Sequence, residues 1–90
     1  MFRWNLDKNR ILIEKRDISF EEIVEAINEG LVISDSVHEN PDKYPNQRVL
    51  IVVAKNYTYL VPYVIDGNDI FLKTIIPSRK AHKANKGAGQ

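Results

Sequence analysis

The sequence predicts an α+β domain in which helices pack on one face of an antiparallel sheet. Three observations predict this class. Two segments near the N-terminus carry helix-capping residues, and three apolar runs between residues 48 and 76 are rich in Val, Ile, Tyr and Phe and bounded by turn residues. Such runs are typical of consecutive antiparallel strands. A basic segment after Pro77 completes the order of strand, two helices, four-stranded meander and short helix, which is an α+β layout.

The first elements lie before residue 18. Phe2 to Trp4 is a short apolar start that we expect to be an edge strand. Asn5 is a candidate N-cap, and a helix is expected from Leu6 to about Lys15. Asp17 follows it and can adopt the left-handed conformation. The expected buried stripe of this helix consists of Leu6, Asn9, Leu12 and Ile13.

The second helix has the clearest local signature. Ser19 is followed three residues later by Glu22, a capping box, and Ile18 and Ile23 flank it as a hydrophobic staple. Gly30 is expected to end the helix as its C′ residue. Its apolar face consists of Phe20, Ile23, Val24 and Ile27, and its glutamates are Glu21, Glu22, Glu25 and Glu29. We interpret these glutamates as solvating and capping residues.

Leu31 to Val37 is expected to form the next strand, with Leu31, Ile33 and Val37 directed inward. Residues 38–47 contain two prolines and two asparagines, which predicts a loop. His38 and Asp42 in this loop could suggest a metal site. Two ligands are a weak signal, and a surface loop histidine is the favoured interpretation.

The sheet centre is expected between Arg48 and Ile76. The run from Arg48 to Ala54 has apolar residues at both its odd-numbered and its even-numbered positions, so that both faces of the strand are apolar. This pattern predicts a strand deep in the sheet. A second strand is expected from Tyr57 to Ile65 and a third from Ile70 to Ile76, joined by a tight hairpin at residues 66–69. Pro62 cannot donate to a ladder, so a bulge or broken pair is expected there. Ser78 can cap one or two helical turns from Arg79.

Composition and charge restrict the class of protein. Ninety residues suffice for one small domain, expected to span residues 1–86 with a flexible tail at 87–90. The absence of cysteine excludes disulfides and thiolate zinc sites and is compatible with a reducing cytoplasm. No apolar run reaches the ~18 residues of a membrane helix, and no signal-peptide pattern opens the chain. We therefore expect a cytoplasmic protein that does not enter a membrane.

The charge is divided unevenly along the chain. Residues 1–69 carry eight Lys/Arg and twelve Asp/Glu, a net charge of −4, whereas residues 70–90 carry five Lys/Arg and no acid, a net charge of +5. This asymmetry suggests a polyanion or an acidic partner. The alternative is a solvated basic tail, which charge alone favours. No P-loop, Rossmann fingerprint, nucleophile elbow or zinc motif is present.

Two motifs resemble those of a known family. Trp4, Lys8 and the run from Ile18 to Glu22 resemble the N-terminal signature of the BrnT family of bacterial toxins, and the run from Ile75 to Ala81 resembles the family's C-terminal motif. Arg48 fits the family's Arg before the first long strand. The chain departs from the family pattern over residues 12–17, at Thr74 and at Pro77.

The resemblance implies a RelE-like fold and a ribonuclease toxin of a type II toxin–antitoxin system. The implied partners are an RNA substrate and a BrnA-like antitoxin, which itself binds operator DNA, so that DNA is contacted only through the antitoxin. A dimer within the antitoxin complex is one expected assembly. RelE-like enzymes cleave RNA largely with Arg, Lys and Tyr, which implies neither a metal nor another cofactor.

RNA cleavage through the 2′-hydroxyl needs a base, cations at the non-bridging oxygens and a donor for the leaving 5′-oxygen. Arginine matches phosphate oxygens in a bidentate fork, so Arg48 and Arg79 rank first. The candidate catalytic residues are Lys8, Arg48, Arg79, Tyr63 and His82, and the candidate RNA-binding residues are Lys73, Lys80 and Lys83. In the alternative interpretation Arg48 pairs with a sheet-edge carboxylate, and Trp4 is a core residue. A silent module that holds a helical partner, and nucleic-acid binding without cleavage, are the competing functions.

Overall fold

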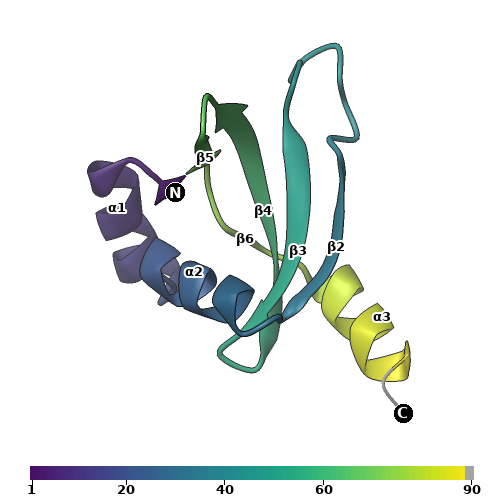
Figure 1. Ribbon diagram of the computed structural model, residues 1–90. Coiled ribbons are helices and arrows are strands. Elements are labelled where there is room, and N and C mark those ends of the chain that lie inside the picture. The colour runs from purple at the N-terminus through teal and green to yellow at the C-terminus, as the bar shows by residue number, and fades with distance from the viewer. Residues whose placement is uncertain (89–90) are drawn as a thin grey trace.

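The computed structural model describes residues 1–88 and shows a twisted sheet with helices on both of its faces (Figure 1). The elements are β1 (Phe2–Arg3), α1 (Leu6–Arg16), α2 (Phe20–Asn28), β2 (Val32–Val37), β3 (Arg48–Ala54), β4 (Tyr57–Asp66), β5 (Asp69–Leu72), β6 (Ile76–Pro77) and α3 (Arg79–Ala88). The predicted α+β class is confirmed. The last two residues of the expected tail, Gly89 and Gln90, lie outside the described residues.

The six strands form one mixed sheet. Its order is β1-β5-β4-β3-β2, with β6 also paired to β4. Strands β2 to β5 form the predicted antiparallel meander. The predicted edge strand is also confirmed, but β1 pairs with β5 in parallel, with Phe2 opposite Ile70. The sheet is therefore antiparallel at its centre and parallel at one edge.

Pro62 interrupts the sheet on one side only. On the β3 side the register is unbroken, with Pro62 opposite Val49. On the other side β5 pairs with β4 only as far as Tyr63, and β6 resumes pairing at Leu60. The Lys73 amide still donates to the Pro62 carbonyl at 2.8 Å. The broken pair is thus confirmed, and the single strand expected from Ile70 to Ile76 is two strands because Pro62 has no amide hydrogen to donate.

Helix α1 begins and ends as predicted but buries a narrower face. The Asn5 side chain accepts the Lys8 amide at 2.9 Å, and Asp17 is left-handed with φ 54°. Of the expected stripe, Asn9 and Leu12 are buried, whereas Leu6 is 74% and Ile13 48% exposed. The stripe prediction is wrong at these two residues because only Asn9 and Leu12 of α1 are covered by the rest of the protein. Asn9 Oδ1 accepts the Phe20 amide at 2.8 Å.

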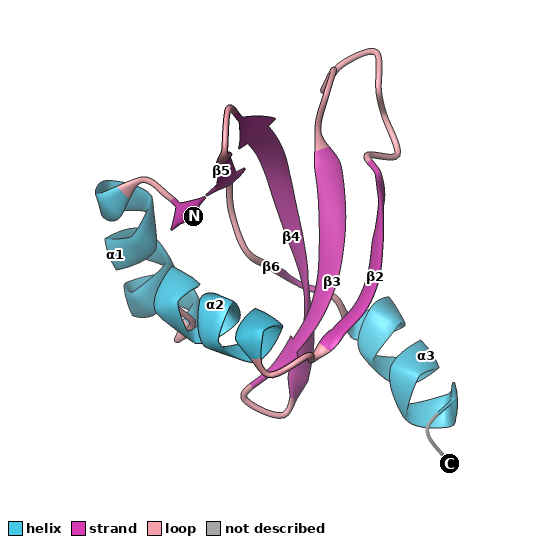
Figure 2. Cartoon of the chain, viewed as in Figure 1, coloured by secondary structure: helices cyan, strands magenta, loops and turns pink. Residues whose placement is uncertain are grey.

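Helix α2 packs its apolar face into the core. Both hydrogen bonds of the capping box between Ser19 and Glu22 are present, and Gly30 follows the helix with φ 81°. Ile18, Phe20 and Ile23 are completely buried. The buried core consists of Leu12, Ile18, Phe20, Ile23, Ala26, Leu50, Val52, Ala54, Tyr59, Val61, Tyr63, Leu72 and Ile75. Because α1 and α2 cover this side of the sheet, the predicted packing of the two N-terminal helices on one face is confirmed (Figure 2).

The inward set of β2 was predicted incorrectly. Leu31, Ile33 and Val37 are 43%, 45% and 61% exposed, and Val32 packs against the core instead. The register shifts between Val32 and Ser34. Such a bulge adds one residue to the strand, so that side chains before and after it no longer follow a single alternation between the two faces of the sheet. Strand β2 is also an edge strand, so the residues beyond the bulge are only partly covered.

Helix α3 lies on the face opposite α1 and α2 (Figure 1). Its Ala81 and Ala84 line a hollow together with Ile33 and Ile51. The Ser78 hydroxyl accepts the Ala81 amide at 3.1 Å, which confirms the predicted cap. The helix is longer than the one or two turns expected. No helix among the described residues is long and apolar enough to cross a membrane.

Candidate functional site

Three polar side chains meet where β2, β3 and β4 lie side by side. Arg48 begins β3 directly opposite Tyr63 of β4, and Asp35 of β2 is opposite Leu50. Paired residues of antiparallel strands point to the same face, and residues two apart share a face. Asp35, Arg48 and Tyr63 therefore project from the face that carries α2, at the end of the sheet beyond the helix.

The three side chains form a closed hydrogen-bonded group, which we call the Asp35 cluster. The Tyr63 hydroxyl donates to Asp35 Oδ1 at 2.7 Å, and Arg48 Nε donates to the same oxygen at 3.1 Å. Arg48 Nε also lies 3.2 Å from the Tyr63 hydroxyl, and its Nη2 donates to the Asp35 carbonyl at 3.3 Å. The Arg48 and Asp35 side chains are 38% and 45% exposed, whereas Tyr63 is 5% exposed. The Arg48 guanidinium and the Asp35 carboxylate are thus accessible to a ligand, and their hydrogen bonds to the buried Tyr63 hold them in position.

The electrostatics assign different roles to the three groups. Burial raises the pKa of Tyr63 above its ordinary value of 10.0, and the hydrogen bond to Asp35 adds to the effect. Hydrogen bonds to Tyr63 and then to Asp35 raise the pKa of Arg48. At neutral pH Tyr63 is therefore a proton donor and Arg48 a cation. The Asp35 carboxylate supplies the third function, a proton acceptor, so that one group of contacts holds an acid, a cation and a base.

Sequence reasoning found two members of this cluster and missed the third. Arg48 and Tyr63 were both candidates, and the structure brings them together. Asp35 was not a candidate, although it shares the parity of Ile33 and Val37, which were expected to face inward. An inward carboxylate in a strand was the signal that could have revealed it. The pairing of Arg48 with a sheet-edge carboxylate, the alternative interpretation, is what the structure shows.

Four other candidates lie on α3, away from the Asp35 cluster. Arg79, Lys80 and Lys83 are exposed on this helix. The His82 ring stacks on Tyr57 with centroids 4.4 Å apart, and its Nδ1 lies 3.1 Å from the buried Thr58 hydroxyl. Tyr57 begins β4 and Tyr63 lies six residues further along the strand, which corresponds to roughly 20 Å of extended chain. The structure therefore separates His82 and Arg79 from Arg48 and Tyr63.

The last two candidates stand alone. Lys8 is half-buried on the first turn of α1, on the other side of the sheet from α3 (Figure 1). Lys73 follows β5 and is exposed, with Nζ 5.5 Å from the centroid of the Phe71 ring. No hydrogen bond or ion pair in the described part of the chain joins either lysine to the Asp35 cluster. Trp4 packs against the core and stacks on Phe20 at 5.7 Å, in agreement with its alternative interpretation.

A cavity of 530 Å³ opens beside the Asp35 cluster. It is lined by Val37, Pro41, Tyr44, Asn46, Gln47, Arg48 and Ile65. Arg48 belongs to both the cavity and the cluster, so the two form one continuous site. Tyr44 and Gln47 come from the loop over residues 38–47. The cavity thus places aromatic and amide groups next to the acid, the cation and the base.

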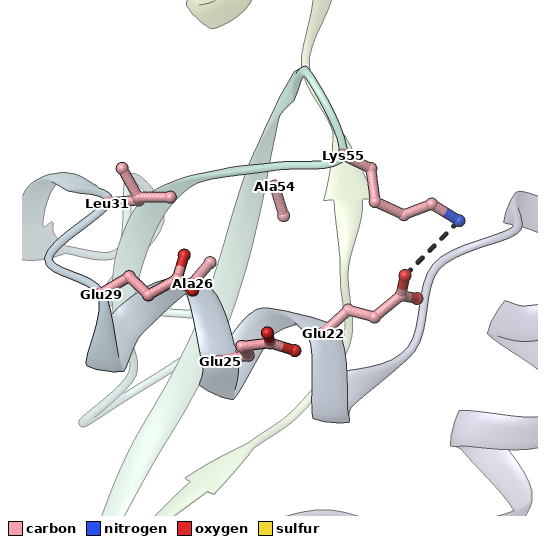
Figure 3. Close-up of a pocket in the computed structure, with 7 residues that line it drawn as sticks. All are labelled: Glu22, Glu25, Ala26, Glu29, Leu31, Ala54 and Lys55. Carbon is pink, nitrogen blue, oxygen red and sulfur yellow. Dashed lines mark ion pairs between the residues drawn. The ribbon is translucent and has the colours of Figure 1, made fainter.

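A second hollow, of 210 Å³, has the opposite character (Figure 3). Glu22 and Glu25 of α2 and Glu29, the residue that follows the helix, line it together with Lys55 from the turn between β3 and β4. Lys55 Nζ lies 3.5 Å from Glu22 Oε2 and donates to the Asp17 carbonyl at 2.7 Å. Lys55 and Asn56 both have positive φ, as a two-residue hairpin turn requires. Three carboxylates repel phosphate, so this hollow is a capped and solvated surface and not an RNA site.

The structure does not assemble the metal site considered at His38 and Asp42. His38 Nδ1 accepts the Asn40 amide at 3.1 Å, and its ring packs on Tyr44 at 4.5 Å. Within residues 1–88, no three His, Asp or Glu side chains are grouped closely enough to hold a metal ion. His38 is therefore a loop histidine that supports Tyr44.

In comparisons with known proteins, no family model, no curated protein and no solved structure matches the chain.

Proposed function

We propose that this protein is a metal-independent endoribonuclease of the BrnT type, the toxin of a bacterial type II toxin–antitoxin pair with a RelE-like fold. The observation that supports this proposal best is the Asp35 cluster, in which three complementary groups lie within 3.3 Å of one another. RNA cleavage through the 2′-hydroxyl needs a base, a cation and an acid, and the cluster contains one of each. Cleavage of RNA in the cytoplasm would inhibit translation and growth.

The reaction uses each group once. Asp35 takes the proton of the 2′-hydroxyl, whose oxygen attacks the adjacent phosphorus. Arg48 stabilises the charge on the non-bridging oxygens. Tyr63 donates its proton to the leaving 5′-oxygen, so that the products are a 2′,3′-cyclic phosphate and a 5′-hydroxyl. The proton gained by Asp35 then returns to Tyr63 along their 2.7 Å hydrogen bond, which restores the starting state.

The cations of α3 have a separate role in this proposal. Arg79, Lys80 and Lys83 are exposed and face no carboxylate in the described part of the chain. They are too far from Tyr63 to act on the same phosphate. We assign them to the RNA backbone outside the reacting nucleotides, where Lys73 can also contribute, and to acidic groups of a BrnA-like antitoxin.

The experiment compares variants of the Asp35 cluster with a matched ion pair elsewhere. Asp35→Asn, Arg48→Lys and Tyr63→Phe should each lower RNA cleavage by about 10²–10⁴-fold, the range for loss of a positioned acid or base. The control pair is Asp7 and Arg10, 3.3 Å apart on the surface of α1. Asp7→Asn and Arg10→Lys should leave cleavage unchanged. Cluster variants that are folded and cleave RNA at the parent's rate would refute the proposed chemistry.

A second candidate function is a silent binding module that holds a helical partner. An apolar groove of 190 Å³ on the α3 face favours it. Val49, Ile51, Leu60, Pro62 and Ile76 provide most of its lining. Amphipathic helices bind such grooves through apolar residues spaced three and four apart. RNA that stays intact with the purified parent, together with binding of a helix that Ile76→Glu abolishes, would favour this function over the nuclease.

A further inference from the structure

We propose that the cavity beside Arg48 is a nucleobase-binding subsite, which holds one base of the RNA next to the phosphate that is cleaved. This inference rests on the proposed ribonuclease function and names what the same site recognises. It concerns the cavity of 530 Å³ lined by Val37, Pro41, Tyr44, Asn46, Gln47, Arg48 and Ile65. Its volume is in the range of about 300–1,000 Å³ that is typical of small-ligand sites.

The loop that forms the cavity wall is held by its own hydrogen bonds. The His38 amide donates to the Gln47 carbonyl at 3.0 Å, and the Tyr44 amide donates to the Asn40 carbonyl at 2.9 Å. The Gln47 amide donates to the Tyr44 carbonyl at 3.3 Å. These bonds close the loop across its neck and within its turn. The wall is therefore formed before a ligand arrives, and little ordering is required on binding.

The chemistry of the wall matches a base. The Tyr44 ring packs on His38 at 4.5 Å, which fixes an aromatic surface on which a base can stack. Asn46 and Gln47 carry amides, and each amide has donors and an acceptor for the edge of a base. Within residues 1–88 neither side-chain amide has a hydrogen-bond partner. Val37 and Ile65 contribute apolar surface to the same cavity.

The position of the cavity fits the proposed reaction. Arg48 lines the cavity and also donates to Asp35 in the Asp35 cluster. A base in the cavity would place its own phosphate close to this guanidinium. An apolar peptide side chain would offer no partners to the Asn46 and Gln47 side-chain amides and would make no use of the Arg48 charge, which is unfavourable in a partly desolvated site. The wall thus favours a nucleobase over a hydrophobic side chain.

The test uses 2′-fluoro tetranucleotides of A, C, G or U, which lack the nucleophilic hydroxyl and cannot be cleaved by the proposed route. Binding is followed by fluorescence anisotropy. We expect one base to bind more tightly than the others. Tyr44→Leu should weaken that binding about tenfold, as loss of one stacked base does, whereas Tyr44→Phe, the matched control, should retain it.

Two further variants separate base recognition from charge. Gln47→Ala keeps the loop's backbone hydrogen bonds and should reduce the difference between the four tetranucleotides. Lys43→Ala removes a cation 5.4 Å from the Tyr44 ring centroid and should weaken all four alike. Thermal melts verify that each variant is folded.

The outcomes distinguish this inference from the proposed function. If the parent cleaves RNA while Tyr44→Leu and Gln47→Ala bind the tetranucleotides as the parent does, the subsite is refuted and the nuclease stands. If Tyr44→Leu weakens binding and no RNA is cleaved, the subsite stands and the nuclease is refuted. Equal binding of the four tetranucleotides by the parent would also overturn the inference.

Discussion

Asp35 links the other two groups of the candidate site, since both Tyr63 and Arg48 donate to its Oδ1 atom. The Arg48 and Asp35 side chains, which form an ion pair, are both partly exposed to solvent. Exposed ion pairs contribute at most about 1 kcal/mol to stability. A phosphate can therefore compete for the guanidinium at little cost, and Asp35 is then free to accept a proton. Asp35 thus neutralises Arg48 in the free protein and can be replaced at the guanidinium by a phosphate of the RNA in the proposed reaction.

The buried tyrosines give a prediction on pH. Burial is the main cause that raises the pKa of both Tyr59 and Tyr63 above 10.0. Their contribution to stability is therefore fully present below pH 10 and is lost as the pH rises through their folded pKa values. In a spectrophotometric titration, part of the phenolate absorbance should appear only above the range of ordinary tyrosine. Tyr63→Phe should reduce this late fraction, and an unchanged late fraction would contradict the assignment.

At the scale of elements, α2 is defined by local signals and α3 by its docking. The capping box of α2 satisfies backbone groups within four residues of sequence, from Ser19 to Glu22. Helix α3 starts with a similar local cap at Ser78, but it is held in place by Thr58 and Tyr57 of β4 through His82. His82 therefore has a structural role that is independent of any proton transfer.

The capping box gives a prediction on stability. Ser19→Ala removes the side chain that accepts the Glu22 amide at 3.1 Å. It should lower the free energy of unfolding by about 1 kcal/mol, which corresponds to roughly 4–8 °C in Tm for a domain of this size. Ser36→Ala on the exposed edge strand β2 is the control and should leave Tm nearly unchanged. Equal melting temperatures for both variants would mean that the cap contributes nothing.

At the scale of the whole molecule, the acidic surface of α2 and the basic helix α3 lie on opposite faces of the sheet. The glutamates of α2 surround the hollow between α2 and the turn between β3 and β4, and the cations of α3 lie on the other face (Figure 1). A polyanion is therefore attracted to α3 and repelled from the glutamates around the hollow of α2. The Asp35 cluster and its cavity lie beyond the end of α2, where these glutamates are absent from the lining.

This distribution predicts a salt dependence. The double variant Lys80→Ala and Lys83→Ala should lower the dependence of log K on log salt for single-stranded RNA by about 0.7 per lost phosphate contact. The matched control, Arg10→Ala with Lys15→Ala, removes two exposed cations from α1 and should change the slope little. If the control changes the slope as much as the α3 variant, the two faces do not differ in their attraction for RNA.

The sequence by itself determined the features that depend on neighbours along the chain. It predicted the N-caps of all three helices, the left-handed Asp17, the long strands β2, β3 and β4 and the interruption at Pro62. Each depends on backbone hydrogen bonds or φ preferences within a few residues, which the local residue types specify. It also identified Arg48 and Tyr63 as candidate site residues, because their side chains have the chemistry that phosphate and proton transfer require.

Only the tertiary structure decided which residues meet. The bulge after Val32 changed the inward set of β2, and the packing of α1 buried Asn9 and Leu12 but left Leu6 exposed. The pairing of β2 with β3 brought Asp35 to Arg48, 13 residues away in sequence. Folding of α3 onto the opposite face took His82 away from Tyr63. These contacts depend on strand register and packing between distant segments, and no local preference encodes either of them.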